Sequence, residues 1–116
     1  LNVLCIDKEI HLDAEEIKVI VNDDNRVLKA SKTIAPAHAM GESIGIEKIC
    51  PDTAILLFAE LKTMMAQDQN HQEYYEGAYE RLMEKDVPFH ALDITGLKWS
   101  EIDTKQDFDA AEKIFA

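Results

Sequence analysis

Residues 93–108 read DITGLKWSEIDTKQDF and concentrate several chemistry-bearing side chains in one short passage. The passage holds the only tryptophan, one of the four glycines, and carboxylates at positions 93, 101, 103 and 107. Its pattern predicts a strand that leads into a helix. Carboxylates at such a junction serve as a helix cap, as a divalent-cation site, or as both.

A helix cap accounts for two of these side chains. Thr104 and Asp107 match a capping box, with aspartate in place of the usual glutamate at the fourth position. Glu101 and Asp103 have no such role, and on a predicted strand they point to the same side as Trp99. Mg²⁺ takes one or two carboxylates together with substrate phosphates. Spacing alone leaves both a metal site and ordinary surface carboxylates open.

The rest of the chain predicts an α+β domain. Apolar patterns and turn formers indicate a mixed sheet with helices packed on it, with strands at 1–6, 18–22, 27–31, 44–49, 89–93 and 97–102 and helices at 51–66, 73–84 and 105–115. The strongest local prediction is a hairpin over 18–31. Residues 32–43 are expected to form a long loop.

Apolar stripes predict which side of each of the three helices faces the core, and on the helix at 73–84 the stripe consists of Tyr75, Ala78, Tyr79, Leu82 and Met83. On the first helix the stripe consists of residues 54, 57, 58, 61, 64 and 65. On the last helix it consists of Phe108, Ala111, Ile114 and Phe115.

Composition bounds the class of protein. With 116 residues the chain is near the commonest domain size, so one domain over 1–116 is expected. A net charge of -11 argues against a nucleic-acid partner. No apolar run approaches the roughly 20 residues that span a bilayer, and Cys5 and Cys50 suit free thiols in a reducing compartment. We therefore expect no membrane partner and a cytoplasmic location.

Three further side chains are candidate ligand contacts, each with a plain structural alternative. Lys32 follows a hairpin strand and can pair with a phosphate, or it is a solvated surface lysine. Glu42 follows Gly41 and can receive a cationic or hydroxylated ligand, or Gly41 simply provides a turn before a strand. Tyr75 offers an aromatic face to a quaternary ammonium, or it belongs to the core side of a helix.

Three segments carry a resemblance to a known family. They read GESIGIEKI at 41–49, EYYE at 73–76 and LDITGLKWSEIDTKQDF at 92–108, and the Trp-x-Glu-Ile-Asp-Thr passage is the most specific. In the same order they resemble the C-terminal half of the nucleotidyltransferases that include sugar-phosphate nucleotidyltransferases and phosphocholine cytidylyltransferases. The resemblance implies the C-terminal portion of a nucleotide-diphospho-sugar transferase-like fold. It also implies transfer of a nucleotidyl group from a nucleoside triphosphate to a phosphorylated sugar or alcohol, with Mg²⁺ as cofactor and pyrophosphate as by-product.

The resemblance also implies roles for single residues. Asp103 is similar to the family's C-terminal ligand for catalytic Mg²⁺, with Glu101 beside it. Lys32 looks like the catalytic lysine that contacts the acceptor phosphate. Acceptor recognition is expected at Glu42 and Tyr75, and Trp99 is grouped with them as substrate-binding.

The family's N-terminal half has no counterpart in these residues. It carries a glycine-rich nucleotide loop and a second metal-binding aspartate, and glycines only at 41, 45, 77 and 96 cannot form such a loop. Because the chain opens on Leu1 inside an apolar strand, we expect an incomplete fragment of a larger nucleotidyltransferase domain that is inactive alone. A Leu-Ala-Ala-Gly-x-Gly-type segment is then expected upstream of Leu1.

A second class of function stays open. The alternative is a non-catalytic acidic module that forms a homodimer through exposed sheet edges, because unpaired edges recruit partners. Within the enzyme interpretation, the acceptor is a sugar phosphate, phosphocholine or a phosphonate. The nucleotide base is also open, and a cytidylyl group is one option.

Overall fold

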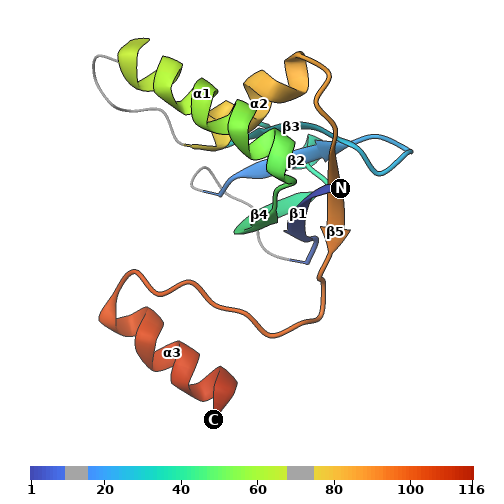
Figure 1. Ribbon diagram of the computed structural model, residues 1–116. Coiled ribbons are helices and arrows are strands. Elements are labelled where there is room, and N and C mark those ends of the chain that lie inside the picture. The colour runs from blue at the N-terminus through green and yellow to red at the C-terminus, as the bar shows by residue number, and fades with distance from the viewer. Residues whose placement is uncertain (10–15, 68–74) are drawn as a thin grey trace.

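A five-stranded mixed sheet forms the centre of the protein (Figure 1). The computed structural model describes residues 1–9, 16–67 and 75–116. In chain order the strands are β1 (Asn2–Asp7), β2 (Lys18–Val21), β3 (Val27–Ser31), β4 (Gly41–Lys48) and β5 (Phe89–Asp93). Their order across the sheet is β3-β2-β4-β1-β5, with β1 and β5 parallel and the β1–β4, β2–β3 and β2–β4 pairs antiparallel. The predicted α+β class is confirmed.

The hairpin of β2 and β3 forms where the sequence predicts it. Asn22 starts the turn, and its Oδ1 accepts hydrogen bonds from the backbone N–H groups of Asp24 and Arg26, both at 3.0 Å. Asn25 takes a φ of 65°, in the left-handed region that asparagine tolerates. The turn chemistry is therefore local, which is why the sequence reveals it.

Helices α1 (Pro51–Gln67) and α2 (Glu76–Glu84) cover the core of the protein. Helix α1 packs on α2, and α2 packs on the sheet. The Nζ of Lys85, just after α2, pairs with the carboxylate of Glu60 on α1. This ion pair joins the two helices.

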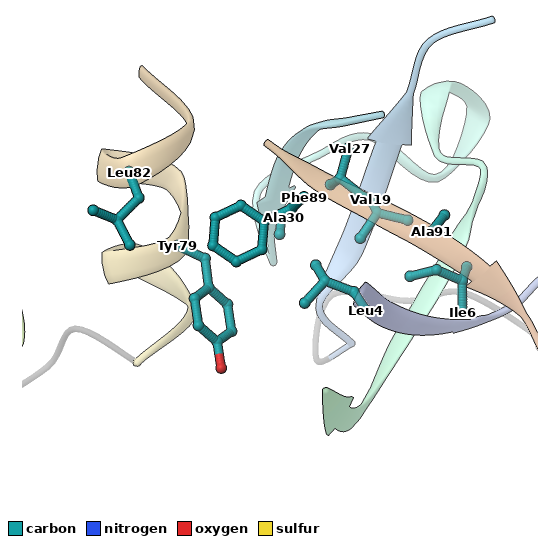
Figure 2. Close-up of a cluster of buried hydrophobic side chains, with 9 residues drawn as sticks. All are labelled: Leu4, Ile6, Val19, Val27, Ala30, Tyr79, Leu82, Phe89 and Ala91. Atoms are coloured by element: carbon teal, nitrogen blue, oxygen red, sulfur yellow. The ribbon is translucent and has the colours of Figure 1, made fainter. Parts of the chain in front are cut away.

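The core lies between α2 and the strands. Figure 2 shows the ring of Phe89 beside Tyr79 of α2, and the two ring centroids are 5.4 Å apart. The buried apolar cluster consists of Leu4, Ile6, Val19, Val27, Ala30, Tyr79, Leu82, Phe89 and Ala91. Leu4 and Ile6 anchor β1 in this cluster, and Phe89 and Ala91 anchor β5. Because the two strands are parallel, their carboxyl ends lie at the same edge of the sheet.

The predicted core face of α1 is partly right: residues 54, 57 and 61 are half-buried, and Leu57 packs against the core cluster. Phe58 and Met65 are 69% and 62% exposed, and of the predicted stripe only Met64 is buried. The helix also buries Thr53 and Glu60, because it packs mainly on α2, and it meets the sheet where Thr53 Oγ1 accepts a hydrogen bond from Asn2 Nδ2 of β1. Apolar residues surround most of α1, so the spacing alone could not select the packed side.

The expected strand at 97–102 is absent, so the described residues contain five strands and not six. After β5 the backbone turns: Gly96 has a φ of 92°, and the Leu97 N–H donates to the Ile94 carbonyl at 3.0 Å. The loop predicted at 32–43 is also shorter than expected, because β4 begins at Gly41 and a 3₁₀ turn, η1 (Pro36–His38), lies within it. The first two residues expected in α2, 73 and 74, lie outside the described residues.

Helix α3 (Lys105–Phe115) begins with the predicted capping box. Thr104 Oγ1 accepts from the Asp107 N–H at 3.1 Å, and Asp107 Oδ2 accepts from the N–H groups of Asp103 and Thr104 at 3.0 and 3.1 Å. Figure 1 shows α3 apart from the sheet and the other helices. Of its predicted inward residues only Ala111 is buried. No helix of the described residues is long and apolar enough to cross a membrane.

Thr104→Ala is expected to destabilise α3 by about 1 kcal/mol, because it removes the hydroxyl that caps the helix. Amide hydrogen exchange in α3 should rise about fivefold while exchange in the sheet stays unchanged. The hydrogen bonds from Asp103 first, and then from Thr104, lower the pKa of Asp107. The cap is therefore complete above the ordinary pKa of an aspartate and weakens as pH falls through the lowered value. Thr63→Ala, at an exposed threonine of α1, is the control and should leave α3 exchange unchanged.

Candidate functional site

Five of the six predicted site residues line one pocket of about 410 Å³. They are Lys32, Glu42, Tyr75, Glu101 and Asp103, and we call this cavity the Lys32 pocket. Lys32 follows β3, Glu42 lies on β4, Tyr75 directly precedes α2, and the two acidic residues lie between β5 and α3. Residues distant in sequence therefore converge because the sheet and α2 bring these segments together.

Trp99, the sixth predicted residue, lines an adjoining pocket of about 410 Å³. This Trp99 pocket shares Glu16, Glu42 and Glu101 with the Lys32 pocket. Trp99 Nε1 donates a hydrogen bond to Asp7 Oδ2 at 2.6 Å. That bond fixes the irregular segment after β5 against the end of β1, so Glu101 and Asp103 are placed by this anchor and not by strand alternation.

Asp7 belongs to this region although the sequence interpretation omitted it. It ends β1, is only 8% exposed, and lines the Trp99 pocket. Its Oδ1 also accepts from the Glu9 N–H at 2.9 Å. Ligands of sheets with parallel strands usually bind beyond the carboxyl ends of those strands, which is where Asp7 lies. The available signal was an aspartate directly after the apolar run 1–6, which indicated only a strand end.

Tyr75 remains a hydroxyl donor at physiological pH. Its O–H donates to Glu47 Oε1 at 3.3 Å. Burial, followed by the nearby carboxylates of Glu76 and Glu47, raises the pKa of Tyr75. Burial likewise raises the pKa of Glu47, and burial with the same carboxylates raises the pKa of Tyr79 to about 12. The ring of Tyr75 meets Tyr79 edge to face at 5.7 Å, which fixes its position.

The carboxylates suit a metal that is shared with phosphate. Within the described residues, no group of three or more His, Cys, Asp or Glu side chains is arranged to hold a metal ion. Asp103 is exposed and lines the Lys32 pocket. Because Mg²⁺ commonly uses one or two carboxylates and completes its shell with water and phosphate oxygens, Asp103 fits such an ion. A fully protein-enclosed metal site does not fit these residues.

Known proteins are similar to this chain in structure but not in sequence. No family model matches the chain, and no curated protein matches it by sequence. Among solved structures it is similar to CTP:phosphocholine cytidylyltransferase (LicC) from Streptococcus pneumoniae, with a TM-score of 0.72 and 16% identity over 99% of this chain and 48% of that one. The chain has a nucleotidyltransferase-like fold.

A second solved structure shares this nucleotidyltransferase-like fold. The inositol-1-phosphate CTP transferase from T. maritima is similar with a TM-score of 0.65 and 18% identity, over 97% of this chain and 45% of that one. The chain thus spans just under half the length of both neighbours. Identities this low establish the shared fold, and the residues of the site carry any argument about function.

Proposed function

We propose that this chain is the acceptor- and metal-binding half of a nucleotidyltransferase. The enzyme transfers a nucleotidyl group, cytidylyl on our proposal, from a nucleoside triphosphate to a phosphorylated small molecule. The observation that carries the proposal is the convergence of Lys32, Glu42, Tyr75 and Asp103 on one pocket of a nucleotidyltransferase-like fold. The two solved structures described above are both named for CTP-dependent transfer, which favours the cytidylyl group.

The proposed reaction is a substitution at the α-phosphorus. An oxygen of the acceptor phosphate forms a bond to that phosphorus, and the bond to the oxygen bridging the α and β phosphorus atoms breaks. Pyrophosphate leaves with the electron pair. Because the reactants are all anionic, positioning and neutralisation of charge supply most of the catalysis.

The residues of the site divide this work. Lys32 holds the acceptor phosphate as a fixed positive charge, and Tyr75 and Glu42 contact the rest of the acceptor. Asp103 would hold Mg²⁺, and Asp7 in the adjoining pocket is the candidate second carboxylate. When bound, Mg²⁺ neutralises charge that develops on the phosphates. The nucleotide itself requires a glycine-rich loop that these residues do not provide, so we propose that they are inactive alone.

The proposal is tested by pyrophosphate release in the whole polypeptide that carries these residues. CTP and Mg²⁺ are supplied with phosphocholine, phosphoethanolamine, an aminoalkyl phosphonate or a sugar phosphate in turn. We expect one acceptor class to release pyrophosphate well above the acceptor-free control. Release that never depends on an acceptor would contradict nucleotidyl transfer.

Lys32→Ala is expected to raise the KM for the acceptor about 10- to 100-fold, because a charged contact to phosphate is lost. The KM for CTP should change by less than about threefold. Lys29→Ala is the matched control, since Lys29 is an exposed lysine of β3 outside the Lys32 pocket. Equal effects of the two substitutions on the acceptor KM would remove Lys32 from the site.

Exposed apolar surface favours a second candidate function, self-association as an acidic interaction module. Ile55, Phe58 and Met65 on α1 are 70%, 69% and 62% exposed, and β3 and β5 are the edge strands of the sheet. Sedimentation over a range of concentrations distinguishes the candidates: a dimer without acceptor-dependent pyrophosphate release would favour the module.

We also propose a cytoplasmic location, because Cys5 and Cys50 are both free thiols.

A further inference from the structure

Glu76 is buried in a way that the fold alone does not explain. It is the first residue of α2 and is only 9% exposed. Within the described residues its Oε2 has no hydrogen-bond partner. An unpaired buried carboxylate oxygen destabilises a protein, because water is removed and nothing replaces it.

The start of a helix accounts for the charge of Glu76 but not for its burial. Negative charge in the first turn of α2 is favourable through the helix dipole. That effect needs no burial, and the N-cap position, Tyr75, makes no side-chain capping bond. Glu76 therefore occupies a costly environment for which the helix offers no full compensation.

The surroundings of Glu76 point to a ligand. Glu76 lines the Lys32 pocket together with Tyr75. Tyr75 has a single hydroxyl proton, and the carboxylates of Glu47 and Glu76 both lie close enough to compete for it, so this one donor cannot satisfy both. The pocket is also strongly acidic, with carboxylates at 16, 42, 76, 101 and 103. A ligand whose phosphate contacts Lys32 therefore binds most tightly if its other end is cationic.

Within the part of the chain that the structure describes, Glu76 Oε2 lacks a hydrogen-bond donor, and this distinguishes two kinds of cationic ligand. A quaternary ammonium has no N–H group and is usually held by several aromatic faces. Among the described residues that line the Lys32 pocket, Tyr75 is the one aromatic side chain. A primary ammonium offers three N–H donors, which is what a buried carboxylate oxygen lacks.

We propose that the acceptor of this site is a phosphorylated or phosphonylated primary amine whose ammonium group donates to Glu76. The proposal rests on the proposed function for the statement that the ligand is an acceptor. The ammonium site itself rests on Glu76, Tyr75 and the acidic lining of the pocket.

The test compares phosphoethanolamine with phosphocholine, which have the same phosphate and the same two-carbon spacer and differ only in three N-methyl groups. Binding to the 116-residue chain is followed by NMR chemical-shift titration. We expect a Kd for phosphoethanolamine at least tenfold below that for phosphocholine. Equal affinities, tighter binding of phosphocholine, or no binding of either would overturn the proposal.

Two variants assign the preference to Glu76. Glu76→Gln should remove the tenfold preference, whereas Glu84→Gln, which makes the same charge change at the other end of α2, should preserve it. The melting temperature of Glu76→Gln should equal or exceed that of the wild type, because folding does not require the unpaired carboxylate. A clearly lower melting temperature would assign Glu76 to the structure and overturn the ligand role.

The two proposals fail in different ways. If phosphoethanolamine binds with the expected preference but never supports pyrophosphate release from CTP, nucleotidyl transfer is wrong and the amine site stands. If pyrophosphate release occurs with phosphocholine or a sugar phosphate and not with phosphoethanolamine, the amine specificity is wrong and nucleotidyl transfer stands.

Discussion

Asp103→Ala is expected to lower CTP-dependent pyrophosphate release at least 100-fold in the whole polypeptide that carries these residues. A carboxylate that holds a metal shared with phosphate acts on the charge that develops in the transition state, and a loss of about 3 kcal/mol corresponds to this factor. Asp103 is free to do so, because within the described residues its backbone N–H bonds to Asp107 while its exposed carboxylate lines the pocket. The measurement is the initial rate at saturating CTP, Mg²⁺ and acceptor.

A matched variant separates this effect from the general loss of negative charge. Glu112→Ala removes one carboxylate from α3, outside the Lys32 pocket and the Trp99 pocket. Its rate should stay within about threefold of the wild type. If Asp103→Ala also stays within that range, Asp103 does not hold the catalytic metal.

Gly41→Ala is expected to destabilise the chain by about 2–3 kcal/mol, the largest effect on stability among single-methyl additions that we predict. A Cβ at position 41 would lie 2.5 Å from the backbone oxygen of Asp7 and 2.8 Å from Cγ2 of Ile6. The oxygen belongs to the β1–β4 pairing and cannot move without disturbing it. The melting temperature followed by circular dichroism should fall by roughly 10 °C.

Gly96→Ala provides the comparison. Gly96 has a φ of 92°, but nothing lies within 4 Å of an added Cβ, so only backbone strain of about 1 kcal/mol is expected. Gly41→Ala should therefore reduce stability clearly more than Gly96→Ala. A reversed order would show that the close approach of β1 and β4 at Gly41 is not rigid.

Local chemistry is the part of the fold that the sequence predicts well. The hairpin turn at 22–26 and the capping box of Thr104 and Asp107 depend on side chains that bond backbone groups a few residues away. The apolar alternation at 97–102 is also local, but a strand additionally needs a neighbour to pair with. The turn at Gly96 leads this segment away from the sheet, so the pattern was misleading.

Long-range geometry explains what the sequence could not reveal about the site. Lys32, Glu42, Tyr75 and Asp103 were grouped through a family resemblance, and the structure brings them to one pocket, while their chemical roles stay predictions. Asp7 was missed because its contact with Trp99 joins residues 92 positions apart. Only the placement of the segment after β5 against the end of β1 makes that contact visible.

Paramagnetic mapping of the 116-residue chain tests most directly whether Asp103 and the Lys32 pocket bind a divalent cation together with phosphate. Mn²⁺ replaces Mg²⁺, phosphoethanolamine supplies the phosphate, and broadening of backbone amide signals reports the position of the ion. We predict selective broadening at 101–104 and at Asp7 in the wild type, lost in Asp103→Ala and kept in Glu112→Ala. Broadening spread over the whole acidic surface, and equal in all three proteins, would contradict the proposed site.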